Sequence, residues 1–177
     1  MFFPYAGIAH DAQLYTLQAL SHVAPELYQN DIFLRFGSQD KFTFFSPVYA
    51  TFIELLGVER AGALLTLVGH CLFISAAFLL ANKIMPDGIA VFSVGLILTI
   101  ASSYGAERVF YYIELFVTPR MLSEAFVLFS VVAWLNRKNI MAAALLLVAA
   151  LLHPLMATAG LVFLLSSVYV AYWRRLS

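Results

Sequence analysis

Charged residues are scarce in this chain of 177 residues. Asp, Glu, Lys and Arg make up only 11% of it, against about 25% in a typical soluble domain. Hydrophobic residues make up 63%, and the mean hydropathy is +0.89. The basic and acidic residues cancel, so no basic excess indicates a nucleic-acid partner. The scarcity of charge excludes an ordinary soluble domain and predicts an integral membrane protein.

The residues of several familiar active sites are also missing. The single cysteine, Cys71, excludes an intrachain disulfide and a CxxC-type metal site. There is no GxSxG motif, no glycine-rich phosphate loop and no Cys–His nucleophile pattern. The four histidines do not have metal-ligand spacing, and a divalent cation shared by Asp11 and Asp31 has no support from spacing. We therefore expect no metal and no cofactor. The first residues lack the basic region and long apolar stretch of a signal peptide.

The apolar runs predict an all-α, polytopic membrane protein with about five transmembrane helices. Residues 61–82 contain no charge and are long enough for a span, which needs about 20 residues. The other spans are expected at 88–104, 119–135, 139–152 and 154–173. A single helix across the last two would be about 50 Å long, too long to span, so His153-Pro154 is expected to mark a hairpin. These spans form a transmembrane module, residues 61–177.

Residues 1–60 are expected to form an external loop with juxtamembrane amphipathic helices. Between Asp11 and Val23, leucines recur every three positions, which suits a helix on a membrane surface or packed against other helices. Ser46-Pro47 indicates an N-cap followed by proline at the first helical position, and Gly57 indicates a stop. The helix between them is about 15 Å long, too short to span. Residues 36–40 are predicted to form a turn, and residues 107–118 an interfacial loop rich in aromatics.

Basic residues give the orientation of these spans. The connections after the first, third and fifth spans carry Lys83, then Arg137-Lys138, then Arg174-Arg175. The remaining basic residues lie on the other side beside most of the acids, which makes one side net positive and the other net negative. The positive-inside rule then places residues 1–60, the 105–119 loop and His153-Pro154 outside. The unusual polar residues gather on that outer face, which suggests a site there.

Asp11 is the first candidate for chemistry, because it is flanked by His10, Gln13 and Tyr15 in an otherwise apolar protein. The alternative is that Asp11 is only the N-cap of the helix that follows, and that interpretation is favoured by spacing alone. The two roles do not exclude each other.

Arg120 and Glu124 lie four residues apart in the third span and so share a helix face. They form either an internal ion pair or an anchor for an anionic head group, because charges near a membrane tend to face a bundle interior or a wet cavity. His153 is either a polar turn residue, which we favour, or part of the site. His70, inside a span, is expected to bond to a neighbouring helix and is given no role.

The order of these features resembles the GT-C membrane glycosyltransferases that use polyprenyl-phosphate-linked sugars. That group includes protein mannosyltransferases and the aminoarabinose transferase of lipid A. Its members carry an acidic Asp-x-x-x-Tyr motif in the first external loop, and His10-Asp11-Ala12-Gln13-Leu14-Tyr15 occupies that place. Ser46-Pro47-Val48-Tyr49 and Gly57-Val58-Glu59-Arg60 are similar to the juxtamembrane helix and the glycine that follow. Thr118-Pro119-Arg120 and Leu152-His153-Pro154 resemble, in rearranged form, the later external segments.

The resemblance implies transfer of a sugar from a polyprenyl-phosphate carrier to an acceptor glycan, lipid or protein. The transfer would take place on the outer face of the bacterial inner (plasma) membrane. It implies Asp11 as the catalytic base, and His10, Tyr15, Arg120, Glu124 and His153 as substrate-binding residues. The chain departs from the family in having Ala12 where a second acid is usual and in having no helix before the loop. Family members continue with further spans, so an N-terminal module is expected. The alternatives are a non-enzymatic module of a lipid-linked-sugar transporter or flippase, and a glycan polymerase or ligase.

Overall fold

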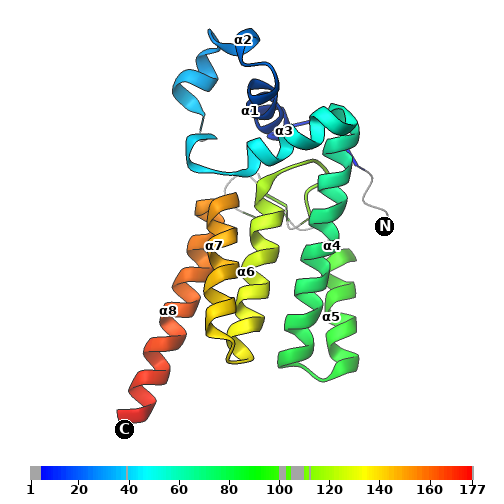
Figure 1. Cartoon of the computed structure of the whole chain (residues 1–177). Helices are drawn as coiled ribbons and strands as arrows, with labels where there is room; N and C mark the ends of the chain where they lie inside the picture. The colour runs from blue at the N-terminus through cyan, green and yellow to red at the C-terminus, as the bar shows by residue number, and fades with distance from the viewer. Residues whose placement is uncertain (1–4, 39, 100–102, 105–109, 112, 177) are drawn as a thin grey trace.

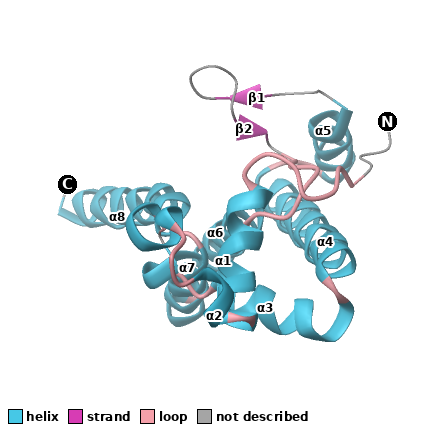
Figure 2. Cartoon of the chain, turned by 90° about the horizontal axis from the view of Figure 1, so that it is seen from above, coloured by secondary structure: helices cyan, strands magenta, loops and turns pink. Residues whose placement is uncertain are grey.

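Helices form nearly all of the described chain in the computed structural model, which describes residues 5–38, 40–99, 103–104, 110–111 and 113–176. One helical pair is α4 (Val58–Ile84) and α5 (Asp87–Thr99), and a second group is α6 (Pro119–Leu135), α7 (Asn139–Leu152) and α8 (Pro154–Leu176). They run side by side as a bundle, with α6 between α4 and α7, and the C-terminal part of α8 extends away from the others (Figures 1 and 2).

The helix boundaries match most of the predicted spans. Helices α6 and α7 begin and end at the predicted residues, and the His153-Pro154 break between α7 and α8 is confirmed. Serine hydroxyls fasten α6 to α7, because Ser123 donates to the Ala149 carbonyl over 2.9 Å and Ser130 donates to the Ala142 carbonyl over 2.7 Å. Among the described residues, α4 is the one helix long and apolar enough to cross a membrane, and the other apolar helices are shorter.

The predicted span 88–104 is wrong at its C-terminal end. Helix α5 is described as far as Thr99, residues 100–102 lie outside the described residues, and β1 (Ser103–Tyr104) pairs antiparallel with β2 (Phe110–Tyr111). Aromatic residues fit a strand as well as they fit an apolar helix, and periodicity does not separate the two in so short a run. The predicted aromatic loop therefore contains part of a small ribbon, and its residues 107–109 and 112 lie outside the described residues.

The N-terminal segment folds over one end of the bundle, which we name the site end (Figure 1). It contains α1 (Ala12–Val23), α2 (Pro25–Tyr28), a π-helical turn at Phe33–Gly37, a 3-10 turn at Asp40–Phe42 and α3 (Phe45–Leu56). Phe44 donates its N–H to the Leu151 carbonyl over 2.8 Å, which joins the start of α3 to the end of α7. The site end therefore brings together residues 5–60, the segment before α6 and the α7–α8 junction.

Two local predictions in this segment are wrong. Ser46 is not an N-cap, because α3 begins at Phe45 with Phe44 as its N-cap. Ser46 is buried instead, and its hydroxyl donates to Gln18 of α1 over 3.3 Å. The predicted turn at residues 36–40 is divided between the π-helical and 3-10 turns, while Gln39 lies outside the described residues. Gly57 does end α3, at a φ of 79° that favours glycine.

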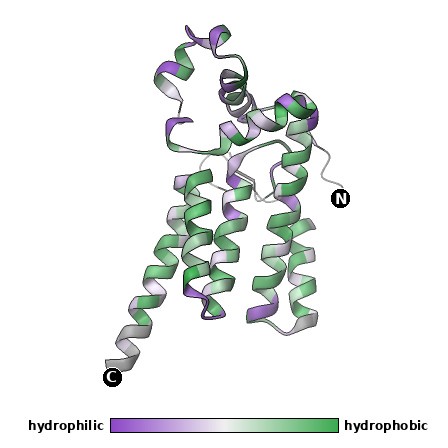
Figure 3. Ribbon diagram, in the orientation of Figure 1, coloured by the Kyte–Doolittle hydropathy of each residue, from purple (hydrophilic) through white to green (hydrophobic). Residues whose placement is uncertain are grey.

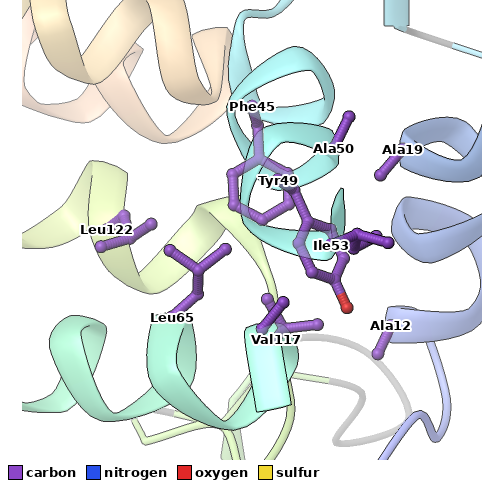
Figure 4. Packing of buried hydrophobic residues seen from close by; sticks show 10 residues of the cluster. Ala12, Ala19, Phe45, Tyr49, Ala50, Ile53, Leu65, Val117 and Leu122 are labelled. Carbon is purple, nitrogen blue, oxygen red and sulfur yellow. The ribbon is translucent and has the colours of Figure 1, made fainter. Parts of the chain in front are cut away.

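Small residues form much of the packed face of α1, and Leu20 of the leucine series packs beside them. Ala12, Thr16 and Ala19 are buried, whereas Leu14 is exposed. These short side chains let α1 lie close to α3, where Phe45, Tyr49 and Ile53 form the centre of the core with Leu65, Val117 and Leu122 (Figure 4). The hydropathy colouring shows apolar residues along the bundle and polar residues mainly at its two ends (Figure 3). The core at the site end thus packs the N-terminal segment against α4 and α6.

Candidate functional site

A buried arginine lies at the centre of the site end. Arg120 occupies the first turn of α6, and its side chain is only 7% exposed. Its Nη1 lies 2.9 Å from Asp11 Oδ2, and its Nη2 lies 2.6 Å from Glu114 Oε1. A cation in the first turn of a helix meets the positive end of the helix dipole, and a buried charge is costly unless it is paired. The two carboxylates offset both costs. We call Asp11, Glu114 and Arg120 the acid–arginine cluster.

Glu114 is the buried member of this cluster. Its side chain is 4% exposed, and Thr118 donates its hydroxyl to Glu114 Oε2. His70 of α4 donates from Nε2 to the Glu114 carbonyl oxygen over 2.8 Å, so its partner is a loop and not the helix we predicted. Burial raises the pKa of Glu114, and the charge of Arg120 and the Thr118 hydrogen bond oppose that rise. Glu114 therefore fastens the segment before α6 to both α4 and α6.

Asp11 is the open member of the cluster, with a side chain that is 30% exposed. It occupies the N-cap position of α1, but its side chain makes no capping hydrogen bond and its backbone is helical, with φ −62° and ψ −22°. The favoured interpretation of Asp11 as a cap is therefore wrong for its side chain. Both carboxylate oxygens are used elsewhere, since Oδ2 meets Arg120 and Oδ1 lies 3.0 Å from His10 Nδ1.

His10 is held beside Asp11 by two further features. Its ring stacks on Phe116, with centroids 5.6 Å apart and planes inclined by 29°. Its backbone has a φ of 52°, in the left-handed region that non-glycine residues seldom adopt but in which histidine is enriched. The side chain is nevertheless 51% exposed. His10 thus presents an oriented imidazole at the solvent side of the acid–arginine cluster.

Tyr15 lies one turn beyond Asp11 on α1 and is half-buried. Its ring packs edge-on against Phe45, with centroids 5.8 Å apart. Burial raises the pKa of Tyr15, Arg120 opposes the rise, and Asp11 adds to it. Tyr15 therefore belongs electrostatically to the cluster and stays a neutral hydroxyl at physiological pH.

His153 lies at the same end, between α7 and α8. Its Nδ1 accepts the Met156 N–H at 3.4 Å, and its carbonyl accepts from Ser123 at 3.3 Å. Burial lowers the pKa of His153, and the positive charge of Arg120 lowers it further. Glu124 is half-buried one turn further along α6 than Arg120. The site end thus gathers four of the other predicted site residues around Arg120, namely His10, Asp11, Tyr15 and His153.

Sequence reasoning missed Glu114, Thr118 and Phe116 as parts of this site. The available signal was Arg120 itself, because an arginine in the first turn of an apolar helix requires nearby acids. Glu114 is one turn upstream of the helix start, in reach of that arginine. Phe116 has no comparable signal, since an aromatic residue in an aromatic segment indicates only packing.

The arrangement combines a fixed carboxylate with an accessible imidazole, which suits proton transfer. Both terminal nitrogens of Arg120 meet carboxylates, so the contact of Arg120 with a phosphate stays a prediction. Among the described residues, no group of three or more His, Cys, Asp or Glu side chains is placed to hold a metal ion.

No protein-family model, curated protein or solved structure matches this chain. The resemblance to GT-C glycosyltransferases also stays a prediction.

Proposed function

We propose that the chain is a membrane module of five spanning helices, α4 to α8, with the site end on the outer face. Helix α4 supports this by length and composition. Large apolar side chains are also exposed along the other helices, including Phe92 of α5, Leu147 of α7 and Leu165 of α8. Extended apolar surface of this kind marks a contact with lipid or with other protein. Helices α5 and α7 are each about 20 Å long and require local thinning of the bilayer.

Within this module, we propose transfer of a sugar from a polyprenyl-phosphate carrier to an acceptor hydroxyl. The observation that carries the proposal is the state of Asp11: a carboxylate that is not needed as a helix cap is held by a buried arginine at the end of an apolar bundle. Holding a carboxylate in this way gives the fixed geometry that proton removal requires. A non-enzymatic transporter of lipid-linked sugars has no need of a positioned base.

The roles follow from the geometry of the cluster. Asp11 drives removal of the proton from the acceptor hydroxyl as its oxygen bonds to the sugar. The bond between the sugar and the carrier phosphate breaks, and the electron pair leaves on the phosphate oxygen. Arg120, which is itself paired with Glu114, holds Asp11 in place, and we assign to Tyr15 and His153 the contacts with the sugar or its phosphate. Base assistance of this kind is worth roughly 10²–10⁴-fold in rate.

The test uses the protein in lipid nanodiscs with a panel of undecaprenyl-phosphate sugars as donors. Release of undecaprenyl phosphate measures turnover, and binding of undecaprenyl phosphate alone is measured separately. Asp11→Asn is expected to lower turnover by about 10²–10⁴-fold with little change in lipid binding. Asn keeps the size of the side chain and can still accept a hydrogen bond from Arg120.

Glu26→Gln is the matched control, because Glu26 is an exposed acid of the same segment. Its turnover is expected to equal that of the wild type. Normal turnover by Asp11→Asn would mean that the transfer does not need the Asp11 carboxylate, and it would favour the transporter function. A wild type that binds the carrier lipid but releases none of it from any donor would also favour transport.

A further inference from the structure

We propose that the proton of the acceptor is taken by His10 Nε2, and that Asp11 acts as the residue that positions this imidazole. This rests on the proposed function and names the atom that touches the acceptor. The first step is the contact between Asp11 Oδ1 and His10 Nδ1 at 3.0 Å. A neutral imidazole has one donor and one acceptor nitrogen, so a Nδ1–H that donates to Asp11 leaves the lone pair on Nε2.

Accessibility separates the two candidate bases. The His10 side chain is 51% exposed and that of Asp11 is 30% exposed. Both oxygens of Asp11 already face a donor, His10 on one side and Arg120 on the other. An acceptor hydroxyl that approaches from solvent therefore meets the imidazole first. A base must lie within hydrogen-bond distance of the proton that it takes, which favours His10 over Asp11.

The orientation of His10 is enforced from three directions. Asp11 Oδ1 lies against one ring nitrogen, Phe116 stacks on one face of the ring, and the backbone is in the left-handed region, with a φ of 52°. Left-handed backbone in a non-glycine residue has an energetic cost and persists where its surroundings determine it. Phe116 comes from the segment before α6, while His10 precedes α1, so two distant parts of the chain build this one position.

The proposed step conserves atoms and charge. The acceptor oxygen bonds to the anomeric carbon while its proton passes to His10 Nε2. The anomeric carbon–oxygen bond to the carrier phosphate breaks, and its electron pair stays on the phosphate. The imidazolium that forms lies against the Asp11 carboxylate, which stabilises its charge. Release of the proton to water or to the departing phosphate restores the neutral ring.

The test compares His10→Asn with the wild type in nanodiscs. Asparagine also tolerates a left-handed backbone, and its amide can donate to Asp11, so the variant keeps the local fold but has no base. Turnover with undecaprenyl-phosphate sugars is expected to fall by about 10²–10⁴-fold, while binding of undecaprenyl phosphate and the KM for the donor stay unchanged. His22→Asn is the matched control, because His22 is also exposed and also meets a carboxylate, Asp40, at 2.7 Å.

Nitrogen NMR of labelled histidine gives a readout that does not depend on turnover. At a pH where the ring is neutral, His10 is expected to carry its proton on Nδ1 in the wild type, and Asp11→Asn is expected to lose this preference. A proton on Nε2 in the wild type, or normal turnover by His10→Asn, overturns the inference while the proposed function stands. Loss of donor binding in His10→Asn also overturns it and makes His10 a binding residue. A wild type without transfer removes the proposed function and this inference with it.

Discussion

At the site end of the bundle, some charged side chains are buried and paired, beside exposed ones such as Glu26 and Arg60. Arg120 and Glu114 are buried there, and each salt bridge found among the described residues lies at this end. The opposite end, which we name the turn end, carries the α4–α5 and α6–α7 connections. Its basic residues Lys83, Arg137 and Lys138 are exposed, and an open hollow of about 610 Å³ lies beside the last two.

The difference shows two uses of charge in one apolar protein. Exposed basic side chains keep their hydration, so they cost little, and in the proposed membrane module they would set its orientation. Buried charge is costly unless it is paired, so its position is determined by its partners. Catalysis requires charged groups at fixed positions, whereas orientation of a bundle in a membrane does not. The two ends should therefore respond very differently to the same kind of substitution.

Labelling from one side of the membrane should give the largest contrast. In a Cys71→Ser background, Gln13→Cys at the site end and Asn139→Cys at the turn end are both exposed positions. With intact cells and a membrane-impermeant thiol reagent, we expect nearly complete labelling of Gln13→Cys and almost none of Asn139→Cys. Permeabilised cells should label both. Labelling of Asn139→Cys alone in intact cells would invert the proposed orientation.

Removal of the buried cation should have the next largest effect. Arg120→Met removes the cation that both Asp11 and Glu114 contact, and breaking a buried ion pair in this way costs roughly 3–5 kcal/mol. We expect a large fall in the melting temperature of the detergent-solubilised protein. Size-exclusion chromatography with fluorescence detection after heating measures this temperature. Arg137→Met at the turn end is the control and should change stability by no more than about 0.5 kcal/mol.

A second substitution separates lost pairing from lost packing. Arg120→Met combined with Glu114→Gln removes one stranded charge, and the double variant should be more stable than Arg120→Met alone. An Arg120→Met protein as stable as the Arg137→Met control would mean that the acid–arginine cluster contributes no more than a surface charge. The comparison between the two ends would then fail.

The pH dependence of His153 should give a smaller, graded effect. Burial and Arg120 lower the pKa of His153 below its ordinary value of 6.5, so the unfolded state binds its proton before the folded state does. Stability should therefore be constant above about pH 6.5 and fall as the pH drops below it, by at most about 1.4 kcal/mol per pH unit. His153→Asn keeps an N-cap acceptor for α8 without titrating in this range.

The measured quantity is the difference in melting temperature between the wild type and His153→Asn. This difference should turn against the wild type as the pH falls from 7 to 5, in roughly the range that the shifted pKa defines. Other titrating groups are common to both proteins and cancel in the comparison. A difference that is the same at every pH would show that His153 titrates alike in the folded and unfolded states.

A comparison of the predicted and observed positions of individual residues shows which structural features a sequence pattern can predict. Pro119, Pro154 and Gly57 set helix boundaries that were predicted, because backbone restrictions act locally and are visible in one residue. The buried face of α1 was predicted only in part, since Leu20 of the leucine series packs against the core, whereas the fully buried positions include the small residues Ala12, Thr16 and Ala19. The same holds for the site. Asp11 and Arg120 were each recognised, but their contact joins residues more than 100 positions apart and no spacing encodes it.

The smallest effect should come from the backbone of the α6–α7 turn. Arg137 has a φ of 60°, and it ends α6 in a Schellman motif in which Arg137 donates its N–H to the Trp134 carbonyl over 2.8 Å and Lys138 donates to Ala133 over 2.9 Å. Glycine is the usual residue at this position, because a side chain in the left-handed region costs about 1 kcal/mol or more. Arg137→Gly should therefore raise the melting temperature slightly. Lys138→Gly should lower the melting temperature by a similar amount, because Lys138 has a φ of −92° and glycine adds only flexibility there.

Changes in melting temperature of opposite sign at these adjacent positions would show that the turn end keeps Arg137 for its charge and against its backbone preference. A loss of stability in Arg137→Gly would instead mean that the Arg137 side chain holds the turn, as Arg120 holds the site end.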